Sequence, residues 1–270
     1  MEELYHDIFS RNLGIINTAE QKKLAKATVA IAGVGGVGGL LAERLIRLGI
    51  GHLKITDPGD FEKSNFNRQF GSSMSSLNQN KAEVVYGQIK DINPSAQIDW
   101  DNTGIKSQAN ADRFVSGADL IIDEMDFGLF KLSIGLQRAA RRLGKYYFFT
   151  SAIGFGALAV IFSPKGMTLE EYDGLTSNVN LDTISSPKVP LERVIPVIPS
   201  YAPADSYEAL QAVYNGTSPV PTTSVGVGLA SMLAANEALN VLLLRRPIKA
   251  APYFTYVDLM DQKFIVAKSV

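Results

Sequence analysis

A glycine-rich turn near the N-terminus is the sequence feature that most constrains the fold. It follows the apolar run 27–32, a candidate strand, and precedes apolar residues at helical spacing that continue to Leu48. The glycines of the turn are Gly33, Gly35, Gly36 and Gly38. Their spacing contains G-x-G-x-x-G, in which glycines allow a tight turn, close approach of a nucleotide and close helix packing. A strand, this turn and a helix predict the first part of a βαβ unit in a parallel sheet.

An acidic residue, Asp57, ends the next candidate strand, 52–56, and lies about 20 residues beyond the last glycine. A carboxylate at a strand end can accept hydrogen bonds from ribose hydroxyls, and the free N–H groups at the start of a helix can bind a phosphate. The turn and Asp57 together predict a site for an adenine nucleotide. They do not separate NAD from ATP, and a turn that serves packing alone is the alternative interpretation.

Helical and extended patterns alternate along most of the chain. A capping-box pattern from Thr18 to Gln21 predicts the start of a short helix. The other predicted helices are 78–92, 109–115, 130–143 and 225–244, and the other predicted strands are 96–100, 119–125, 146–152, 157–163, 253–259 and 263–268. This alternation predicts an α/β fold, a Rossmann-like doubly wound and mostly parallel sheet with late antiparallel strands.

A proline-rich stretch interrupts this alternation and holds 7 of the 12 prolines between residues 176 and 223. A connection of this length is usually a functional lid or a disordered segment. We therefore expect one domain over 1–270. Its nucleotide-binding part lies at about 27–165, and a long crossover loop at about 166–223 contributes to the substrate site. A C-terminal helix and strands follow at about 224–270.

The composition excludes several classes of site. With no cysteine, the chain has no disulfide, Cys-ligated zinc, iron–sulfur cluster or thiol nucleophile. The net charge of −1 argues against binding to nucleic acid or anionic membrane by bulk charge. The apolar segment 225–244 contains polar residues, so we expect a buried amphipathic helix there and no membrane span. The acidic N-terminus lacks an apolar signal core, so we expect the cytoplasm as the compartment.

Polar and basic side chains follow Asp57 in an unusual density. Asn65, Arg68 and Gln69 lie in the loop after the second strand, and Lys81 lies on the following predicted helix. Two cations beside a ribose site suit a triphosphate better than a nicotinamide. The alternative interpretation is a solvated polar loop followed by an ordinary helix lysine.

These positions carry a specific resemblance. The glycine turn, Asp57 and the pattern Asn-x-x-Arg-Gln with a downstream Lys resemble the ubiquitin-activating superfamily, which includes the ThiF, MoeB and HesA adenylyltransferases. The segment 123–127 resembles the family's next motif, so the resemblance implies that Asp126 holds Mg²⁺ near the phosphates. Phe127 stands where the family has Asn. The segment 9–13 resembles another family motif, which implies that Arg11 reaches the active site of a dimer partner.

The resemblance implies an ATP-dependent enzyme that activates a carboxylate as an acyl-adenylate and releases pyrophosphate. Arg68, Lys81 and Arg11 would stabilise charge, and Asp57, Asn65 and Gln69 would bind the nucleotide. Without cysteine, neither the thioester step nor the zinc site of many members is possible. Cysteine-independent relatives act on a small molecule, a peptide or carrier-protein C-terminus, or a modified tRNA base, and the family habit implies a homodimer.

Two other functions compete with this one. An NAD-dependent oxidoreductase would explain the glycine turn and Asp57, but it would leave Arg68, Lys81 and Asp126 without a joint purpose. A non-catalytic partner subunit of an activating enzyme would be expected to lack that same set of charged residues, which is present here.

Overall fold

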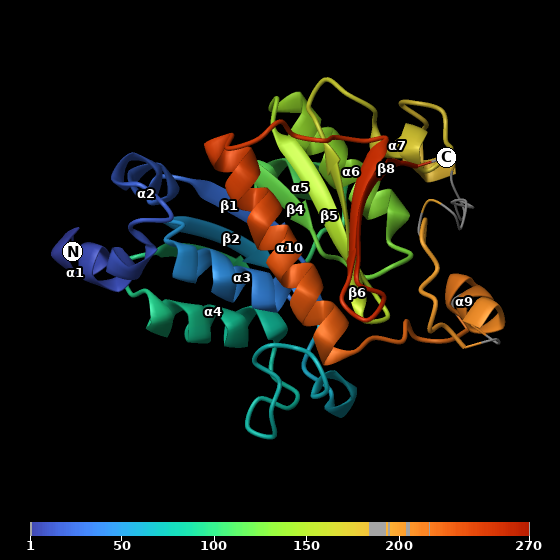
Figure 1. Ribbon diagram of the computed structural model, residues 1–270, viewed down its shortest axis with the longest axis horizontal. Coiled ribbons are helices and arrows are strands. Elements are labelled where there is room, and N and C mark those ends of the chain that lie inside the picture. The colour runs from blue at the N-terminus through green and yellow to red at the C-terminus, as the bar shows by residue number, and fades with distance from the viewer. Residues whose placement is uncertain (1, 184–192, 194, 204–205, 216, 270) are drawn as a thin grey trace.

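One eight-stranded sheet forms the centre of the protein in the computed structural model (Figure 1). The structure describes residues 2–183, 193, 195–203, 206–215 and 217–269. The strand order is β3-β2-β1-β4-β5-β6-β7-β8. The strands are β1 (Thr28–Ala32), β2 (His52–Thr56), β3 (Gln97–Asp101), β4 (Leu120–Asp123), β5 (Tyr146–Ile153), β6 (Gly156–Phe162), β7 (Tyr253–Asp258) and β8 (Lys263–Lys268). β1 to β5 pair in parallel and β5 to β8 pair antiparallel, which confirms the predicted fold class.

Helices cover both faces of the sheet. The α-helices are α1 (Glu2–Phe9), α2 (Thr18–Leu24), α3 (Gly36–Leu48), α4 (Lys81–Ile92), α5 (Gln108–Val115), α6 (Phe130–Arg142), α7 (Leu169–Tyr172), α9 (Ser206–Tyr214) and α10 (Ser224–Leu243). α10 crosses one face beside α3 and α4, and α5 and α6 pack on the other face (Figure 1). The central strands β1 and β4 are therefore buried on both sides, which explains their continuous apolar sequences.

The direction of winding reverses between β1 and β4. From β1 the chain adds β2 and then β3 on one side, whereas β4 and β5 follow on the other side. In open α/β sheets this reversal leaves a crevice at the carboxyl ends of the two strands, where ligands bind. The glycine turn follows β1 and the loop with Asp126 follows β4, so both lie at this crevice.

Helix α10 is the one helix, within the described ranges, that is long and apolar enough to cross a membrane, yet 67% of its most apolar stretch is buried in the domain. It packs against α3, β5 and β6. The predicted burial is confirmed, but the expected amphipathic pattern is weak, because Ser231, Glu237 and Asn240 are among its buried residues while Met232 is exposed. α10 is thus a core helix of this fold.

Two predicted helix starts differ from the structure. The capping box expected from Thr18 is formed one residue earlier, by Asn17 and Glu20, because the asparagine side chain accepts the Glu20 N–H at 2.9 Å. α4 begins at Lys81 and not near Asn78, whose φ of 62° is incompatible with a right-handed helix.

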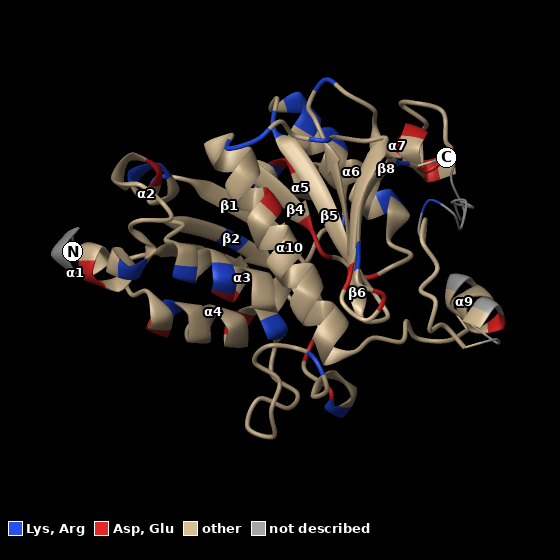
Figure 2. Ribbon diagram, viewed as in Figure 1, with Lys and Arg blue, Asp and Glu red and all other residues tan. Residues whose placement is uncertain are grey.

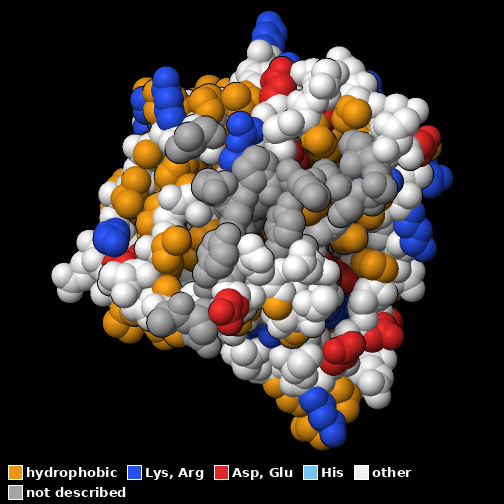
Figure 3. All heavy atoms as spheres, turned by 90° about the vertical axis from the view of Figure 1, so that its right-hand side faces the viewer, with side chains coloured by type: hydrophobic (Ala, Val, Ile, Leu, Met, Phe, Trp, Pro, Cys, Tyr) orange, Lys and Arg blue, Asp and Glu red, His pale blue; other side chains and the backbone are white. Residues whose placement is uncertain are grey.

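The crossover segment contains more regular structure than its prolines predicted. Of residues 166–223, positions 184–192, 194, 204–205 and 216 lie outside the described residues. The described part contains α7, the short 3-10 turn η3 (Leu181–Thr183) and α9. Figure 3 shows the face on the right of Figure 1, where hydrophobic side chains are scattered among polar ones. Figure 2 shows basic and acidic residues mixed along α3 and α4, in agreement with the near-zero net charge.

Candidate nucleotide and substrate site

The glycine turn makes two backbone contacts that no other residue permits. Gly33 has φ +88°, and a Cβ there would lie 2.3 Å from the carbonyl oxygen of Glu124. A Cβ on Gly38 would lie 1.9 Å from the carbonyl oxygen of Gly33. These glycines therefore bring the turn, the first turn of α3 and the loop after β4 into direct contact. Since the first N–H groups of a helix have no partner within the helix, the start of α3 can receive an anion at the crevice.

Asp57 lies beside this turn and is only 8% exposed. Its Oδ2 accepts the N–H of Val34 at 2.9 Å, and its Oδ1 accepts the N–H of Gly59 at 2.8 Å. Burial raises the pKa of Asp57, while these two N–H groups and the ammonium of Lys81 act in the opposite direction. Each oxygen of an ionised carboxylate can accept a second hydrogen bond, so Asp57 retains capacity for a ribose hydroxyl.

Lys81 reaches the same place because of Asn80, which the sequence analysis missed. The Asn80 side-chain amide donates to the carbonyl oxygens of Asp57 and Gly59, each at 3.1 Å, and its oxygen accepts the N–H of Glu83 as the N-cap of α4. The Lys81 Nζ then lies 3.4 Å from the position that a Gly59 Cβ would occupy. An Asn directly before a helical pattern is a known cap signal and could have identified this residue.

The loop after β2 places three predicted residues near the turn. The Nε of Arg68 lies 3.9 Å from the position of a Gly36 Cβ, and the amide of Gln69 lies 3.6 Å from that of Gly35. Gln69 Oε1 is buried without a hydrogen-bond partner among the described residues. Asn65 is 6% exposed, and its Oδ1 accepts the N–H of Glu62 at 3.0 Å, so it also closes the local turn.

Asp126 lies in the loop after β4, which ends at Asp123 and not at residue 125 as predicted. The N–H of Glu124 still donates to Ala32 at 2.8 Å, and this bond holds the loop against the end of β1. Asp126 is exposed, and its negative charge acts to raise the pKa of Asp57, so the two carboxylates share one crevice.

Arg11 is the predicted site residue that does not join the others within one chain. It is exposed in the 3-10 turn η1 (Ser10–Asn12), where the neighbouring Asn12 donates to the carbonyl oxygen of Leu48 at 3.5 Å. Leu48 ends α3, whereas the glycine turn lies at the N-terminal end of this helix. A helix of 13 residues spans about 20 Å, so Arg11 lies at the far end of α3 from the turn.

A cavity of about 130 Å³ opens beside Asp126 and contains two buried acids that the sequence analysis did not single out as site residues. One is Asp123, whose Oδ2 accepts the hydroxyl of Tyr147 at 2.6 Å and whose Oδ1 accepts the N–H of Met125 at 3.0 Å. Burial raises the pKa of Asp123. The other is Asp173, which follows α7 and is 5% exposed. Only the pairing of distant segments brings these acids together.

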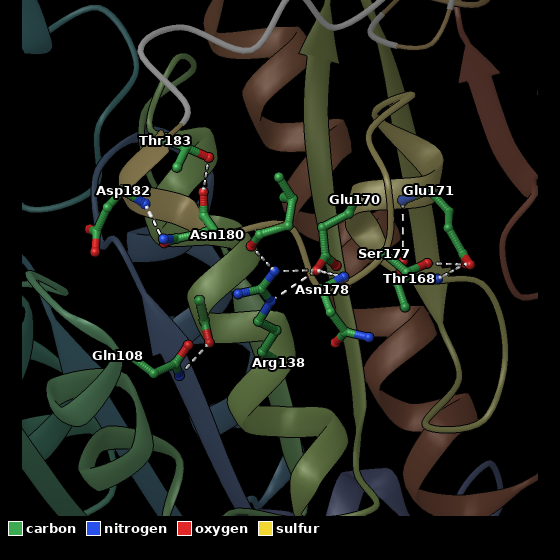
Figure 4. A network of polar contacts seen from close by, with 12 residues as sticks. Gln108, Arg138, Thr168, Glu170, Glu171, Ser177, Asn178, Asn180, Asp182 and Thr183 are labelled. Atoms are coloured by element: carbon green, nitrogen blue, oxygen red, sulfur yellow. Dashed lines mark hydrogen bonds and ion pairs between the residues drawn. The ribbon is translucent and has the colours of Figure 1, made fainter.

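An ion pair ties this side of the cavity to α6. Glu170 on α7 is 1% exposed and lies 2.7 Å from a guanidinium nitrogen of Arg138. The same guanidinium donates to the carbonyl oxygen of Val179 at 2.6 Å, and Gln108 donates to Gly135 on the same helix (Figure 4). These bonds fix α7 and the start of the crossover segment relative to the sheet.

Comparison with known proteins bears on the family and the fold of the chain. The family model described as the ThiF family matches residues 9–269. The chain is 33% identical over 126 residues to tRNA threonylcarbamoyladenosine dehydratase of Bacillus subtilis, covering 47% of this chain and 50% of that protein. It is 37% identical over 106 residues to ubiquitin-like modifier-activating enzyme 5 of Caenorhabditis elegans, covering 39% and 25%. The chain thus aligns with half or less of these curated relatives.

Solved structures share the fold over nearly the whole chain. PaaA superimposes with a TM-score of 0.73 at 14% identity, covering 98% of this chain and 83% of that one. Escherichia coli MccB, solved with ATP, superimposes with a TM-score of 0.73 at 17% identity, covering 97% and 71%. The family model confirms the resemblance seen in the sequence. Since it extends over residues 9–269, the chain belongs to the ThiF family.

Proposed function

We propose that the protein is an ATP-dependent adenylyltransferase that activates a carboxylate as an acyl-adenylate, releases pyrophosphate and uses no cysteine thioester. The observation that supports this most is the gathering of Asp57, Arg68, Lys81 and Asp126 around the glycine turn, where the strand order reverses. Family membership does not favour the NAD-dependent alternative, and the presence of this charged set argues against a non-catalytic partner.

ATP fits the donors and acceptors of the crevice. The first turn of α3 offers N–H groups to phosphate oxygens. Asp57 can accept a ribose hydroxyl in addition to its two backbone bonds. Gln69 Oε1, which is buried without a partner among the described residues, can accept a donor from the nucleoside. Each of these groups has a use when an adenine nucleotide is bound.

Mg²⁺ fits the same site through Asp126. This ion commonly binds one or two carboxylates together with substrate phosphate oxygens, and Asp126 is an exposed carboxylate beside the phosphate-binding turn. When bound, the ion would neutralise charge on the phosphates and orient them. Asp126 would hold it, and Asp57 would remain with the ribose.

The chain's own residues then align the reaction and stabilise its charge. A substrate carboxylate is already ionised at neutral pH, so no general base is required. One carboxylate oxygen forms a bond to the α-phosphorus, and the bond from that phosphorus to the β-phosphate oxygen breaks. Arg68 and Lys81 offset the charge on the phosphate oxygens, and the rigid glycine turn holds the phosphates in line for attack.

The wider assignments are part of the same proposal. The substrate carboxylate belongs to a small molecule, to a peptide or carrier-protein C-terminus, or to a modified tRNA base. One adenylyltransferase domain spans 1–270 and acts in the cytoplasm as a homodimer. The distance of Arg11 from the crevice of its own chain supports a role in the crevice of the partner subunit.

Exchange of labelled pyrophosphate into ATP, measured with a library of carboxylates, tests the proposal. We expect carboxylate-dependent exchange in the wild type and its loss in Asp126→Ala. Asp91→Ala, which changes an exposed acid on α4, is the matched control and should behave as the wild type. Calorimetry should show binding of ATP with Mg²⁺ and not of NAD. Binding of NAD alone would refute the proposal, and undiminished exchange in Asp126→Ala would remove Asp126 from the mechanism.

A further inference from the structure

The cavity beside Asp126 has the size of a small substituent. Its volume is about 130 Å³, and an engineered protein cavity of about 150 Å³ accommodates benzene. Aromatic and aliphatic side chains form much of its wall, including Phe127, Phe149 and Leu169. Phe127 packs edge-to-face on Phe130 with ring centroids 5.4 Å apart, and this contact orients its ring. The space suits an apolar group of a few carbon atoms and is too small for a nucleotide.

The two acids in this cavity differ in one respect. Both oxygens of Asp123 accept hydrogen bonds, from Tyr147 and from the backbone of Met125. Asp173 Oδ2 is buried and has no hydrogen-bond partner in the part of the chain that the structure describes. Buried acceptors without a donor are rare in folded proteins, and each one destabilises the fold.

Arg193, the cation whose charge acts on Asp173, is engaged elsewhere. Arg193 donates to the carbonyl oxygens of Glu171, at 2.7 Å, and of Tyr172. Its charge lowers the pKa of Asp173, yet burial dominates and raises that pKa to about 7, and the nearby Glu170 acts in the same direction as burial. No donor among the described residues reaches this oxygen, and Asp173 is one of the residues that line the cavity, so a group bound there can approach its carboxyl.

We propose that this cavity binds the substituent of the substrate carboxylate and selects a small, largely apolar group that ends in one hydrogen-bond donor directed at Asp173. The inference rests on the proposed function, which places the reacting carboxylate beside Asp126. The donor is a hydroxyl or an ammonium group, which share the chemistry that the free oxygen needs.

Three carboxylates of equal length test this selection: ω-hydroxyhexanoate, ω-aminohexanoate and heptanoate, which ends in a methyl group. Their binding to the intact protein is measured by calorimetry, with and without the non-reactive analogue α,β-methylene ATP and Mg²⁺. We expect at least one of the two donor-bearing acids to bind tenfold or more tightly than heptanoate at about pH 8, above the pKa of Asp173, because a hydrogen bond to the ionised carboxylate contributes about that factor. The better of the two distinguishes a hydroxyl from an ammonium subsite.

Substitution of the acid identifies the source of the preference. Asp173→Leu should abolish or reverse it, and Asp173→Asn should weaken it. Asp182→Asn, an exposed acid on η3 outside the cavity, should leave it unchanged. Thermal melting checks that each variant is folded, and the wild-type comparison of the three acids stands without any variant.

The outcomes separate this inference from the proposed function. Equal binding of the three acids overturns the subsite, even where ATP binding and pyrophosphate exchange are intact. Absence of binding of all three acids up to about 10 mM also overturns the subsite, because ligands of this size bind more tightly than this when they fit a site even modestly. A donor preference that persists without nucleotide supports the subsite by itself, whatever the exchange assay shows.

Discussion

The buried carboxyl of Asp173 makes the stability of the protein depend on pH in a direction that can be measured. Its pKa is raised from the ordinary value of 3.8 to about 7, chiefly because it is buried. The folded state therefore binds a proton between these two pH values that the unfolded state has released. Since stability falls with rising pH wherever the folded state binds more protons, Asp173 contributes stability that is fully present below pH 3.8 and is lost as pH rises to about 7.

The magnitude follows from the size of the shift. Each pH unit in this window changes the free energy of unfolding by at most about 1.4 kcal/mol. Between about pH 5 and about pH 8 the wild type should therefore lose roughly 2–3 kcal/mol from this one group. Asp173→Asn is neutral at every pH and removes this loss, so the variant should gain stability relative to the wild type as pH rises.

Urea unfolding of both proteins at several pH values measures the difference. Subtracting the variant from the wild type cancels the other buried acids with raised pKa, such as Asp57 and Asp123. Asp91→Asn, on the exposed face of α4, provides a control with an equal change of charge. A difference between wild type and Asp173→Asn that is flat over this range, or that increases with pH in favour of the wild type, would refute the reasoning.

Three further substitutions test other parts of the structure. Gly38→Ala should abolish ATP binding in calorimetry, because the new Cβ would overlap the carbonyl oxygen of Gly33. Its control is Gly228→Ala, whose Cβ would have no atom within 4 Å and which should stabilise α10 by up to about 1 kcal/mol. Asn80→Ala should lower the free energy of unfolding by about 1 kcal/mol and raise the KM for ATP, while loss of a similar cap in Ser107→Ala should leave that KM unchanged. Arg138→Met should lower the free energy of unfolding in urea by about 3 kcal/mol, because it leaves the buried Glu170 without its partner. Arg47→Met, which breaks an exposed pair, should lower it by less than about 1 kcal/mol, and equal losses would contradict the importance of burial.

Several features of this protein follow from local sequence alone. The turn between β1 and α3 requires glycine at Gly38 because a Cβ there would overlap the carbonyl oxygen of the nearby Gly33, and the glycine pattern is visible without the fold. The α/β class follows from the alternation of helical and extended patterns. The polar loop after β2 and the acids at strand ends predict the edge of the sheet at which a ligand would bind, because parallel strands end at the same edge.

Other features depend on pairs of residues far apart in the chain. The ion pair of Arg138 with Glu170 and the contact between Asn67 and Thr222, at 3.2 Å, join segments whose separation no local pattern encodes. α9 was missed because prolines surround it, although they lie outside the helix. The distance of Arg11 from the crevice is likewise set by the packing of Asn12 on the far end of α3.

The fold class and the family are therefore readable from the sequence, because both depend on spacings of a few residues, and the same spacings underlie the proposed place of a nucleotide. The state of the two acids depends on folding: Asp123 is hydrogen-bonded, Asp173 lacks a donor among the described residues, and both line one small cavity. Burial and hydrogen bonding are set by the residues that surround a side chain. Those surroundings are assembled here from β4, β5, α6 and α7, which the chain brings together only on folding.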